Sequence, residues 1–305
     1  MCGIVGISAG RDVVQHLISG LQALEYRGYD SAGLAVLHDG RIERLRTRGK
    51  VRELAALQER EPVHGTCGIA HTRWATHGAP VTGNAHPHVS GQVSVVHNGI
   101  IENHAALREE LRALGYVFSS ETDTEVIAHL VEHHQREGLD LLDAARRALA
   151  RMHGAYAVVL LSAREPGVLV GARRGSPLVV GLGEHEQYLA SDVHALLPLT
   201  RRFLYLAEGD LVRIEREQVA VFDAAGNTAE RPVRVSNFSA DAVERGEYRH
   251  YMLKEIHEQP QAVSDTLEGR IAGGHVMPEI FGVGAGEILA QADSVHIIAC
   301  GTSYH

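Results

Sequence analysis

The chain begins Met1-Cys2-Gly3-Ile4-Val5-Gly6-Ile7, which places a cysteine directly before a short apolar run. Because residue 2 is small, we expect the initiator methionine to be trimmed, which leaves Cys2 as the first residue. Its thiol and its own α-amino group then share one carbon, and an amine with a pKa of about 7.7–8.0 can take the thiol proton near neutral pH. The run from Gly3 to Ile7 predicts a buried strand that holds the thiol in place. The alternative is that Met1 stays and Cys2 lies in a frayed terminus.

Length and composition are typical of a soluble protein with two domains. The chain has 305 residues, of which 45% are apolar and 22% are charged, and this length exceeds one ordinary compact core. No apolar run approaches the roughly 18–20 residues of a membrane span, and no signal peptide precedes Cys2. We therefore expect a cytoplasmic protein without a membrane partner.

Charge and the metal-binding residue types argue against several classes of function. The net charge is −9 and no basic cluster is denser than residues 41–50, so we expect no nucleic-acid partner. Cys2, Cys67 and Cys300 have unrelated spacings, which fit neither a disulfide framework nor a zinc site. The 20 histidines show no metal-ligand spacing. We expect no metal and no other cofactor, with Cys67 as a small core residue.

Two polar stretches that contain glycine carry residues suited to a site. Tyr26-Arg27-Gly28-Tyr29-Asp30-Ser31-Ala32-Gly33 is typical of a loop before a strand, and His71-Thr72-Arg73-Trp74-Ala75-Thr76-His77-Gly78 begins where a short strand ends. Arg73 offers a planar fork that matches a carboxylate bidentately. The alternative is that the first stretch is a mere connection, that Trp74 anchors a core, and that Arg73 makes a surface ion pair.

A third stretch, Val93-Ser94-Val95-Val96-His97-Asn98-Gly99-Ile100-Ile101-Glu102-Asn103, is an apolar strand that runs into Asn-Gly. Asn98 can donate a side-chain hydrogen and Gly99 lets a ligand approach its backbone N–H, which suits an oxyanion hole. The alternative is a plain hairpin turn, for which Asn-Gly is the strongest short signal. Further on, Ser120-Glu121-Thr122-Asp123-Thr124-Glu125 opens a helix, and Asp123 taken alone would be a helix-capping acid.

Hydrophobic periodicity predicts helices mainly in the first half of the chain and strands in the second. Helical spacing is found at residues 12–24, 107–114, 126–131 and 140–152. Strands are predicted for residues 3–7, 34–37, 42–45, 155–161, 168–172, 178–182, 188–191, 203–206, 211–214 and 219–222, with a hairpin turn at Asp39-Gly40. This order favours two sheets with helices outside them.

Five of these stretches together resemble the glutaminase domain of the class II glutamine amidotransferases, a family of N-terminal-nucleophile (Ntn) hydrolases. They are residues 2–6, 26–33, 71–78, 97–103 and 120–125, and chance does not place five such motifs in order. Downstream, residues 248–260 resemble the linker helix, and Cys300-Gly301-Thr302-Ser303 resembles the first phosphosugar loop, of the family members that use fructose 6-phosphate. These two separate the chain from members of the purine and asparagine pathways.

The resemblance implies hydrolysis of the side-chain amide of L-glutamine. Cys2 would be the nucleophile, Asn98 and Gly99 would hold the oxyanion, Arg73 would bind the α-carboxylate and Asp123 the α-ammonium group. The other implied residues complete the pocket (Thr76, His77 and His86), lie behind it or gate ammonia transfer (Arg27 and Trp74), or contact a sugar phosphate (Thr302 and Ser303). In full-length members the implied acceptor is fructose 6-phosphate and the implied assembly is a homodimer.

The implied fold class is α+β, a four-layer αββα sandwich with helices outside two antiparallel sheets. It would comprise residues 1–240, followed by a linker at 241–284 and the truncated start of an α/β sugar-isomerase (SIS) domain at 285–305. Within that segment, we expect residues 295–299 to form a buried strand that leads to the phosphate loop. Because the sequence stops at His305, we expect this chain alone to make no amino sugar.

Two other functions stay open. One is the glutaminase domain of another amidotransferase, such as the phosphoribosyl-transferring one, against which residues 248–260 and 300–303 argue. The other is a non-catalytic, glutamine-binding regulatory module. The intact set of Cys2, Arg73, Asn98, Gly99 and Asp123 disfavours it.

Overall fold

The structure is a computed structural model that describes residues 2–75, 78–236, 248–267, 271–272, 275–276 and 285–298. The chain divides into two compact units, Met1–Val243 and Glu244–His305. Each is described by itself below. In the described residues, no helix is both long and apolar enough to cross a membrane.

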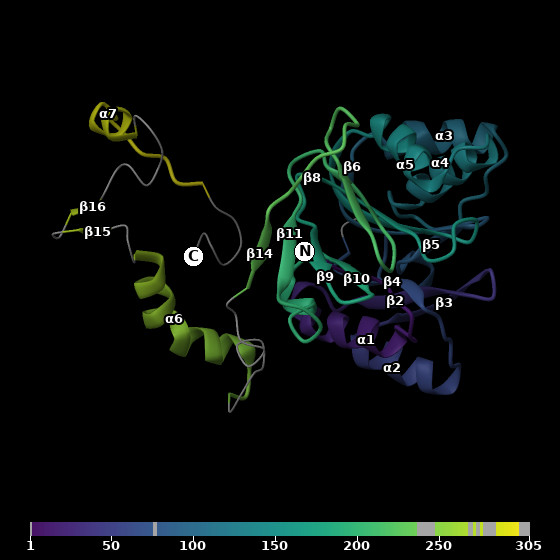
Figure 1. Ribbon diagram of the computed structural model, residues 1–305, viewed down its shortest axis with the longest axis horizontal. Helices are drawn as coiled ribbons and strands as arrows, with labels where there is room; N and C mark the ends of the chain where they lie inside the picture. The colour runs from purple at the N-terminus through teal and green to yellow at the C-terminus, as the bar shows by residue number, and fades with distance from the viewer. Residues whose placement is uncertain are drawn as a thin grey trace. The chain divides into compact units, whose positions relative to one another are not determined.

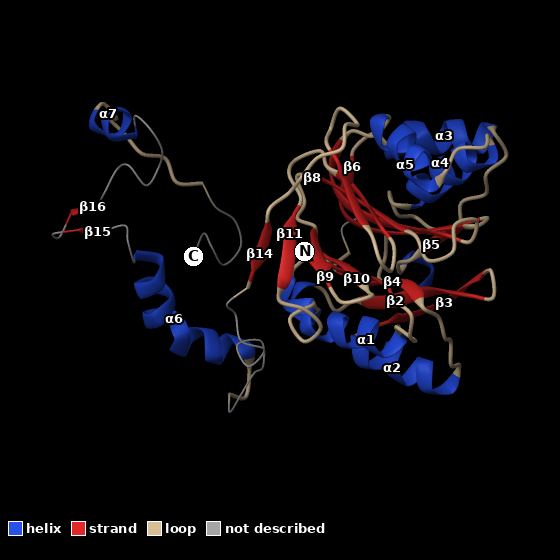
Figure 2. Cartoon of the chain, in the orientation of Figure 1, coloured by secondary structure: helices blue, strands red, loops and turns tan. Residues whose placement is uncertain are grey.

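The described part of the first unit contains two antiparallel sheets (Figures 1 and 2). In spatial order, the eight-stranded sheet consists of β14 (Val233–Val235), β11 (Arg202–Tyr205), β9 (Val179–Leu182), β10 (Gln187–Ala190), β1 (Gly3–Ser8), β4 (Cys67–Arg73), β2 (Ser31–His38) and β3 (Arg41–Arg48). The six-stranded sheet consists of β13 (Val219–Phe222), β12 (Leu211–Ile214), β8 (Leu169–Arg174), β7 (Gly154–Ser162), β6 (Val93–Ile101) and β5 (His88–Ser90).

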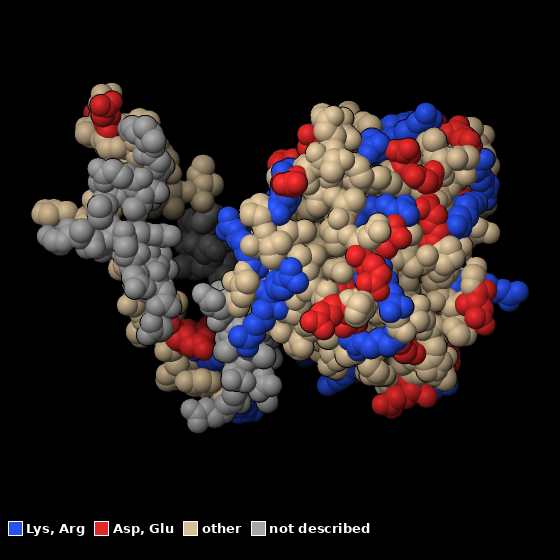
Figure 3. All heavy atoms as spheres, viewed as in Figure 1, with Lys and Arg blue, Asp and Glu red and all other residues tan. Residues whose placement is uncertain are grey.

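Helices cover the outer face of each sheet, as Figure 2 shows. Against the eight-stranded sheet lie α1 (Val14–Ala23) and α2 (Val51–Arg60), and against the six-stranded sheet lie α3 (His104–Ala113), α4 (Glu125–Arg136) and α5 (Leu141–Ala150). A third apolar layer fills the space between the sheets. The predicted four-layer αββα fold is therefore confirmed. On the face shown in Figure 3, acidic and basic side chains of this unit are interspersed.

Strand β1 lies in the middle of its sheet and is buried on both faces. It pairs with β10 on one side and with β4 on the other. Because side chains alternate along a strand, Val5 and Ile7 belong to the core under α1, whereas Ile4 belongs to the core between the sheets. Cys2 thus directly precedes a firmly held central strand, and the frayed-terminus interpretation is wrong. Met1 lies outside the described residues.

Most predicted elements are found, with ends that differ by a few residues. The helix expected at residues 12–24 begins at Val14, whose N–H donates to Oδ1 of Asp12 at 2.9 Å. Among the α-helices and strands of the first unit, α2, β5 and β14 were not predicted. The last two have three residues each, which is too short to show a period, and their partners in the sheets define them.

The described part of the second unit contains three elements that were not predicted and lacks one that was. Its described elements are α6 (Tyr251–Leu267), β15 (Ile271–Ala272), β16 (His275–Val276) and α7 (Ala285–Ala290), of which β15, β16 and α7 were not predicted. The buried strand expected at residues 295–299 is wrong for the part described, since residues 295–298 form no strand and Val295, Ile297 and Ile298 are 78%, 90% and 95% exposed. A strand needs a neighbour to pair with, and none is found among the described residues. Residue 299 and Cys300–Ser303 lie outside them.

Gly33 on β2 gives a first testable prediction about stability. A Cβ atom at this position would lie 2.2 Å from the carbonyl oxygen of His86 and 2.8 Å from that of Leu45. Backbone atoms cannot yield as a flexible side chain does, so Gly33→Ala should lower the free energy of unfolding by about 1–3 kcal/mol. The fluorescence of Trp74, the single tryptophan, reports the change during denaturation with urea.

Gly83→Ala is the matched control for this prediction. The nearest atom to its new Cβ would be the carbonyl oxygen of Ser119 at 4.0 Å. The urea concentration at the midpoint of unfolding should therefore stay close to that of the parent protein. Equal midpoints for the two variants would show that the close approach at Gly33 does not limit stability.

Candidate active site

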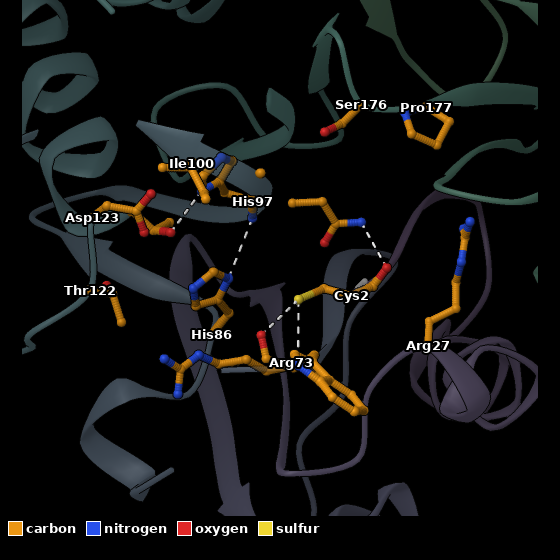
Figure 4. Close-up of a pocket in the computed structure, with 14 residues that line it drawn as sticks. Cys2, Arg27, Arg73, His86, His97, Ile100, Thr122, Asp123, Ser176 and Pro177 are labelled. Carbon is orange, nitrogen blue, oxygen red and sulfur yellow. Dashed lines mark hydrogen bonds between the residues drawn. The ribbon is translucent and has the colours of Figure 1, made fainter. Parts of the chain in front are cut away.

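A cavity of about 260 Å³ opens at the start of β1, where loops from both sheets meet (Figure 4). Its lining includes eight of the residues expected at the site: Cys2, Arg27, Arg73, Trp74, His86, Asn98, Gly99 and Asp123. Thr76, His77, Thr302 and Ser303 lie outside the described residues, so their roles stay predictions. The fold thus brings together expected site residues from Cys2 to Asp123 that are far apart in the sequence.

The thiol of Cys2 lies against the backbone of Trp74. The Trp74 N–H donates to Sγ at 3.2 Å, and Sγ lies 3.6 Å from the Trp74 carbonyl oxygen. Burial raises the pKa of Cys2 above its ordinary value, and the hydrogen bond from the Trp74 N–H offsets this only in part. Because the thiol is then protonated at neutral pH, it needs a base. Among the described residues, these two backbone groups are its hydrogen-bond partners.

Asn98 and Gly99 lie within a strand and do not form a hairpin turn. β6 continues through both residues to Ile101, and Gly99 pairs with Tyr156 of β7. The side chain of Asn98 donates from Nδ2 to the carbonyl oxygen of Cys2 at 2.9 Å. Gly99 has a φ of +131°, and a Cβ there would lie 2.0 Å from the carbonyl oxygen of Ala155. Only glycine therefore fits at this position, and Asn98 and Gly99 line the same cavity as Cys2.

Arg73 and Asp123 place opposite charges on one side of the cavity. Figure 4 shows the guanidinium of Arg73 and the carboxylate of Asp123 on the side away from Arg27, with Cys2 between. Each residue is only 4% exposed. Arg73 donates to the carbonyl oxygens of Gly78 and Ala79 at 3.2 and 3.4 Å. Oδ2 of Asp123 accepts from the N–H of Ile101 at 2.8 Å, so Asp123 is tied to β6 and does not cap α4.

Comparisons with known proteins agree with this arrangement. Residues 71–198 match the family model described as "Glutamine amidotransferase domain". The chain carries a glutamine amidotransferase domain.

Two relatives match this amidotransferase chain along its whole length. Both are named glutamine–fructose-6-phosphate aminotransferase [isomerizing], one from Pseudomonas putida at 56% identity and one from Yersinia pseudotuberculosis at 55%. The match covers 100% of this chain and 50% of each relative, so the chain spans about half the length of the curated relatives it matches. A solved glutamine phosphoribosylpyrophosphate amidotransferase from B. subtilis is 27% identical, with a TM-score of 0.64 over 74% of this chain and 50% of that one.

The loop before α4 holds Asp123 of the amidotransferase domain in place. Glu125 accepts four hydrogen bonds, from the backbone N–H and the hydroxyl of both Ser119 and Ser120, at 2.7–2.8 Å. Burial acts to raise the pKa of Glu125, but these bonds outweigh it and hold the pKa below its ordinary value. Arg108 donates to the carbonyl oxygens of Ser120 and Thr122 at 2.9 and 2.6 Å. The loop that carries Asp123 is thus held by a second carboxylate, Glu125, which does not line the cavity.

Contacts from Tyr29 and Asp30 hold the loop with Trp74. A carboxylate oxygen of Asp30 accepts from the N–H of Ala75, and the rings of Tyr29 and Trp74 meet edge to face with centroids 5.4 Å apart. Arg27 donates to the carbonyl oxygen of Ser191 at 3.0 Å. Residues 26–33 therefore support the loop beside the thiol, and the interpretation as a mere connection is wrong.

The sequence analysis missed six residues that line the amidotransferase cavity: His97, Ile100, Thr122, Thr124, Ser176 and Pro177. Four of them stand inside quoted motifs, next to residues that were singled out. Ser176 and Pro177 follow β8, and no motif marks them. Figure 4 shows these two on the far side of Cys2 from Asp123. Only the contact between distant loops identifies them as part of the site.

Proposed function

We propose that this chain hydrolyses the side-chain amide of L-glutamine, with Cys2 as the nucleophile. The observation that carries the proposal is the position of Cys2 in a cavity that Asn98, Gly99 and the charge pair of Arg73 and Asp123 also line. Arg73 suits the α-carboxylate of glutamine and Asp123 its α-ammonium group. This anchoring directs the amide toward the thiol.

In this mechanism, the α-amino group of Cys2 takes the thiol proton once Met1 has been removed. The thiolate attacks the amide carbon, and the N–H groups of Asn98 and Gly99 stabilise the oxyanion. The ammonium group returns the proton to the leaving nitrogen, so that ammonia departs and a thioester remains. Water then adds to the thioester and releases glutamate and the free thiol.

For the complete protein, the proposed acceptor of this ammonia is fructose 6-phosphate, and the product is glucosamine 6-phosphate. The names of the relatives at 55–56% identity support this acceptor. In this proposal, residues 241–284 are a linker, residues 285–305 begin a sugar-isomerase domain, and Thr302 and Ser303 contact the sugar phosphate. The complete protein would be a cytoplasmic homodimer that uses no cofactor.

Two measurements test this function. Purified chain should convert glutamine to glutamate and ammonia, and a glutamine-mimicking diazoketone should add covalently to the peptide that contains Cys2. Glutamine binding without glutamate or adduct would instead indicate a regulatory module. For the acceptor, protein from the complete gene is given amide-¹⁵N glutamine, with fructose 6-phosphate or phosphoribosyl pyrophosphate. Label in an amino sugar supports the proposal, and label in phosphoribosylamine contradicts it.

Asn98→Ala gives a second prediction, which concerns the chemical step. Loss of one oxyanion donor should lower kcat by roughly 10²–10³-fold, or about 2.7–4 kcal/mol, with little change in KM. Glutamate release at saturating and limiting glutamine separates the two constants. A rise in KM at unchanged kcat would assign Asn98 to substrate binding.

A further inference from the structure

Four buried histidines lie at or next to the cavity: His86 and His97 line it, whereas His71 and His88 do not. The ring centroids of His71 and His86 are 4.2 Å apart, and those of His86 and His88 are 4.8 Å apart. His71 belongs to β4, is fully buried and does not line the cavity. It nevertheless contacts Asn98, the proposed oxyanion donor, directly.

The surroundings of His71 determine which of its ring nitrogens carries a hydrogen. Nε2 lies 3.0 Å from Oδ1 of Asn98 and 3.0 Å from the carbonyl oxygen of His97. The His97 oxygen can only accept, so Nε2 must donate. Nδ1 has no hydrogen-bond partner among the described residues. Burial lowers the pKa of His71 to about 3, so the ring is neutral at pH 7 and its one hydrogen is on Nε2.

This hydrogen determines how the amide of Asn98 is oriented. One end of the amide faces the carbonyl oxygen of Cys2, which needs a donor, and the other end faces Nε2 of His71, which needs an acceptor. Rotating the amide by half a turn would set oxygen against oxygen at Cys2 and N–H against N–H at His71. Both neighbours therefore hold Nδ2 against the carbonyl oxygen of Cys2, and its second hydrogen remains for the oxyanion.

We propose that His71 is a positioning residue, which acts through Asn98 by donating from Nε2 and so orients the oxyanion hole toward Cys2. This proposal rests on glutamine hydrolysis at Cys2 as the function. The competing view is that His71 only fills space beside His86. The two views differ in whether the hydrogen on Nε2 matters and in whether Asn98 must be present.

The first test needs no activity and is therefore separate from the test of the function. In ¹⁵N-labelled protein at pH 7, the imidazole signals that disappear in His71→Gln belong to His71. They should show the neutral form with a slowly exchanging hydrogen on Nε2. A neutral ring with its hydrogen on Nδ1, or a charged ring, would overturn the proposal even if the protein hydrolyses glutamine.

The second test compares His71→Phe, which keeps a ring but no donor, with His71→Gln, which returns an amide N–H near the place of Nε2. His71→Phe should lower kcat roughly 10–100-fold with KM nearly unchanged, because small displacements of a reacting group cost this much. His71→Gln should recover most of the loss. Equal loss in both variants, or an effect on KM alone, would contradict the proposal.

A double-mutant cycle decides whether His71 acts through Asn98. In the Asn98→Ala background, His71→Phe should cause no further loss of kcat, whereas a full second loss would overturn the proposal. His129→Phe is the control for removing a buried imidazole. Its Nδ1 lies 2.8 Å from the hydroxyl of Ser90 and it does not line the cavity, so kcat should stay near that of the parent. Trp74 fluorescence confirms that each variant is folded.

Discussion

Replacing Cys2 by serine or alanine should reduce the release of glutamate from glutamine by roughly 10⁴-fold or more, as for other catalytic nucleophiles. The thiol is the attacking group in the proposed mechanism, and its contacts with the Trp74 backbone aim it into the cavity. A hydroxyl is a far weaker nucleophile, and its pKa is too high for an α-amino group to deprotonate it. Initial rates of glutamate formation by the purified variants measure the effect.

Cys67→Ala is the matched control for this result. Cys67 is fully buried in the core between the sheets, and burial raises the pKa of its thiol to about 12. It should therefore resist alkylation at neutral pH, and its replacement should leave the glutaminase rate near that of the parent. Activity that survives in Cys2→Ala would place the nucleophile elsewhere.

The mass of the mature chain tests the role of the Cys2 amine. In active protein, the first residue should be Cys2. Fully active protein that retains Met1 would contradict the mechanism, because the nitrogen of Cys2 would then be an amide without basicity.

Asp123→Asn should raise the KM for glutamine and lower kcat/KM by roughly two to four orders of magnitude. This loss corresponds to about 3–5 kcal/mol of transition-state stabilisation. The asparagine oxygen can still accept from the N–H of Ile101, as Oδ2 of Asp123 does at 2.8 Å. The change therefore removes the charge and keeps the tie to β6, and the substrate ammonium group is left without its counter-charge in a buried site. Steady-state kinetics and glutamine binding by calorimetry measure the loss.

Glu121→Gln serves as the control, because it removes a charge from the same loop. Oε2 of Glu121 accepts from the side chain of Asn84 at 2.8 Å, and this residue does not line the cavity. Its kcat/KM should remain within about twofold of the parent, as surface substitutions change little. Normal glutamine binding by Asp123→Asn would show that Asp123 serves only to hold β6.

Much of the fold could be predicted because the information is local. The alternation of Ile4, Val5 and Ile7 predicts a strand that is buried on both faces, and the positions of Leu17 and Leu21 predict a helix. The expected strand at residues 295–299 was wrong in its described part because an apolar run is compatible with a strand but does not supply the neighbour that a strand requires. Periodicity shows that a face is apolar, but not what covers it.

The sequence by itself determined the family motifs and, through them, Cys2, Arg73, Asn98, Gly99 and Asp123 as the candidate site. Two ambiguities were decided only by the tertiary structure, since Asn98-Gly99 continues a strand and Asp123 is bound to Ile101. The contact between His71 and Asn98 was also revealed only by the tertiary structure, because neighbouring layers bring β4 and β6 together. A hydrogen bond between residues that are 27 positions apart leaves no periodic signal, because its geometry depends on how two sheets pack rather than on the residues next to it in the chain.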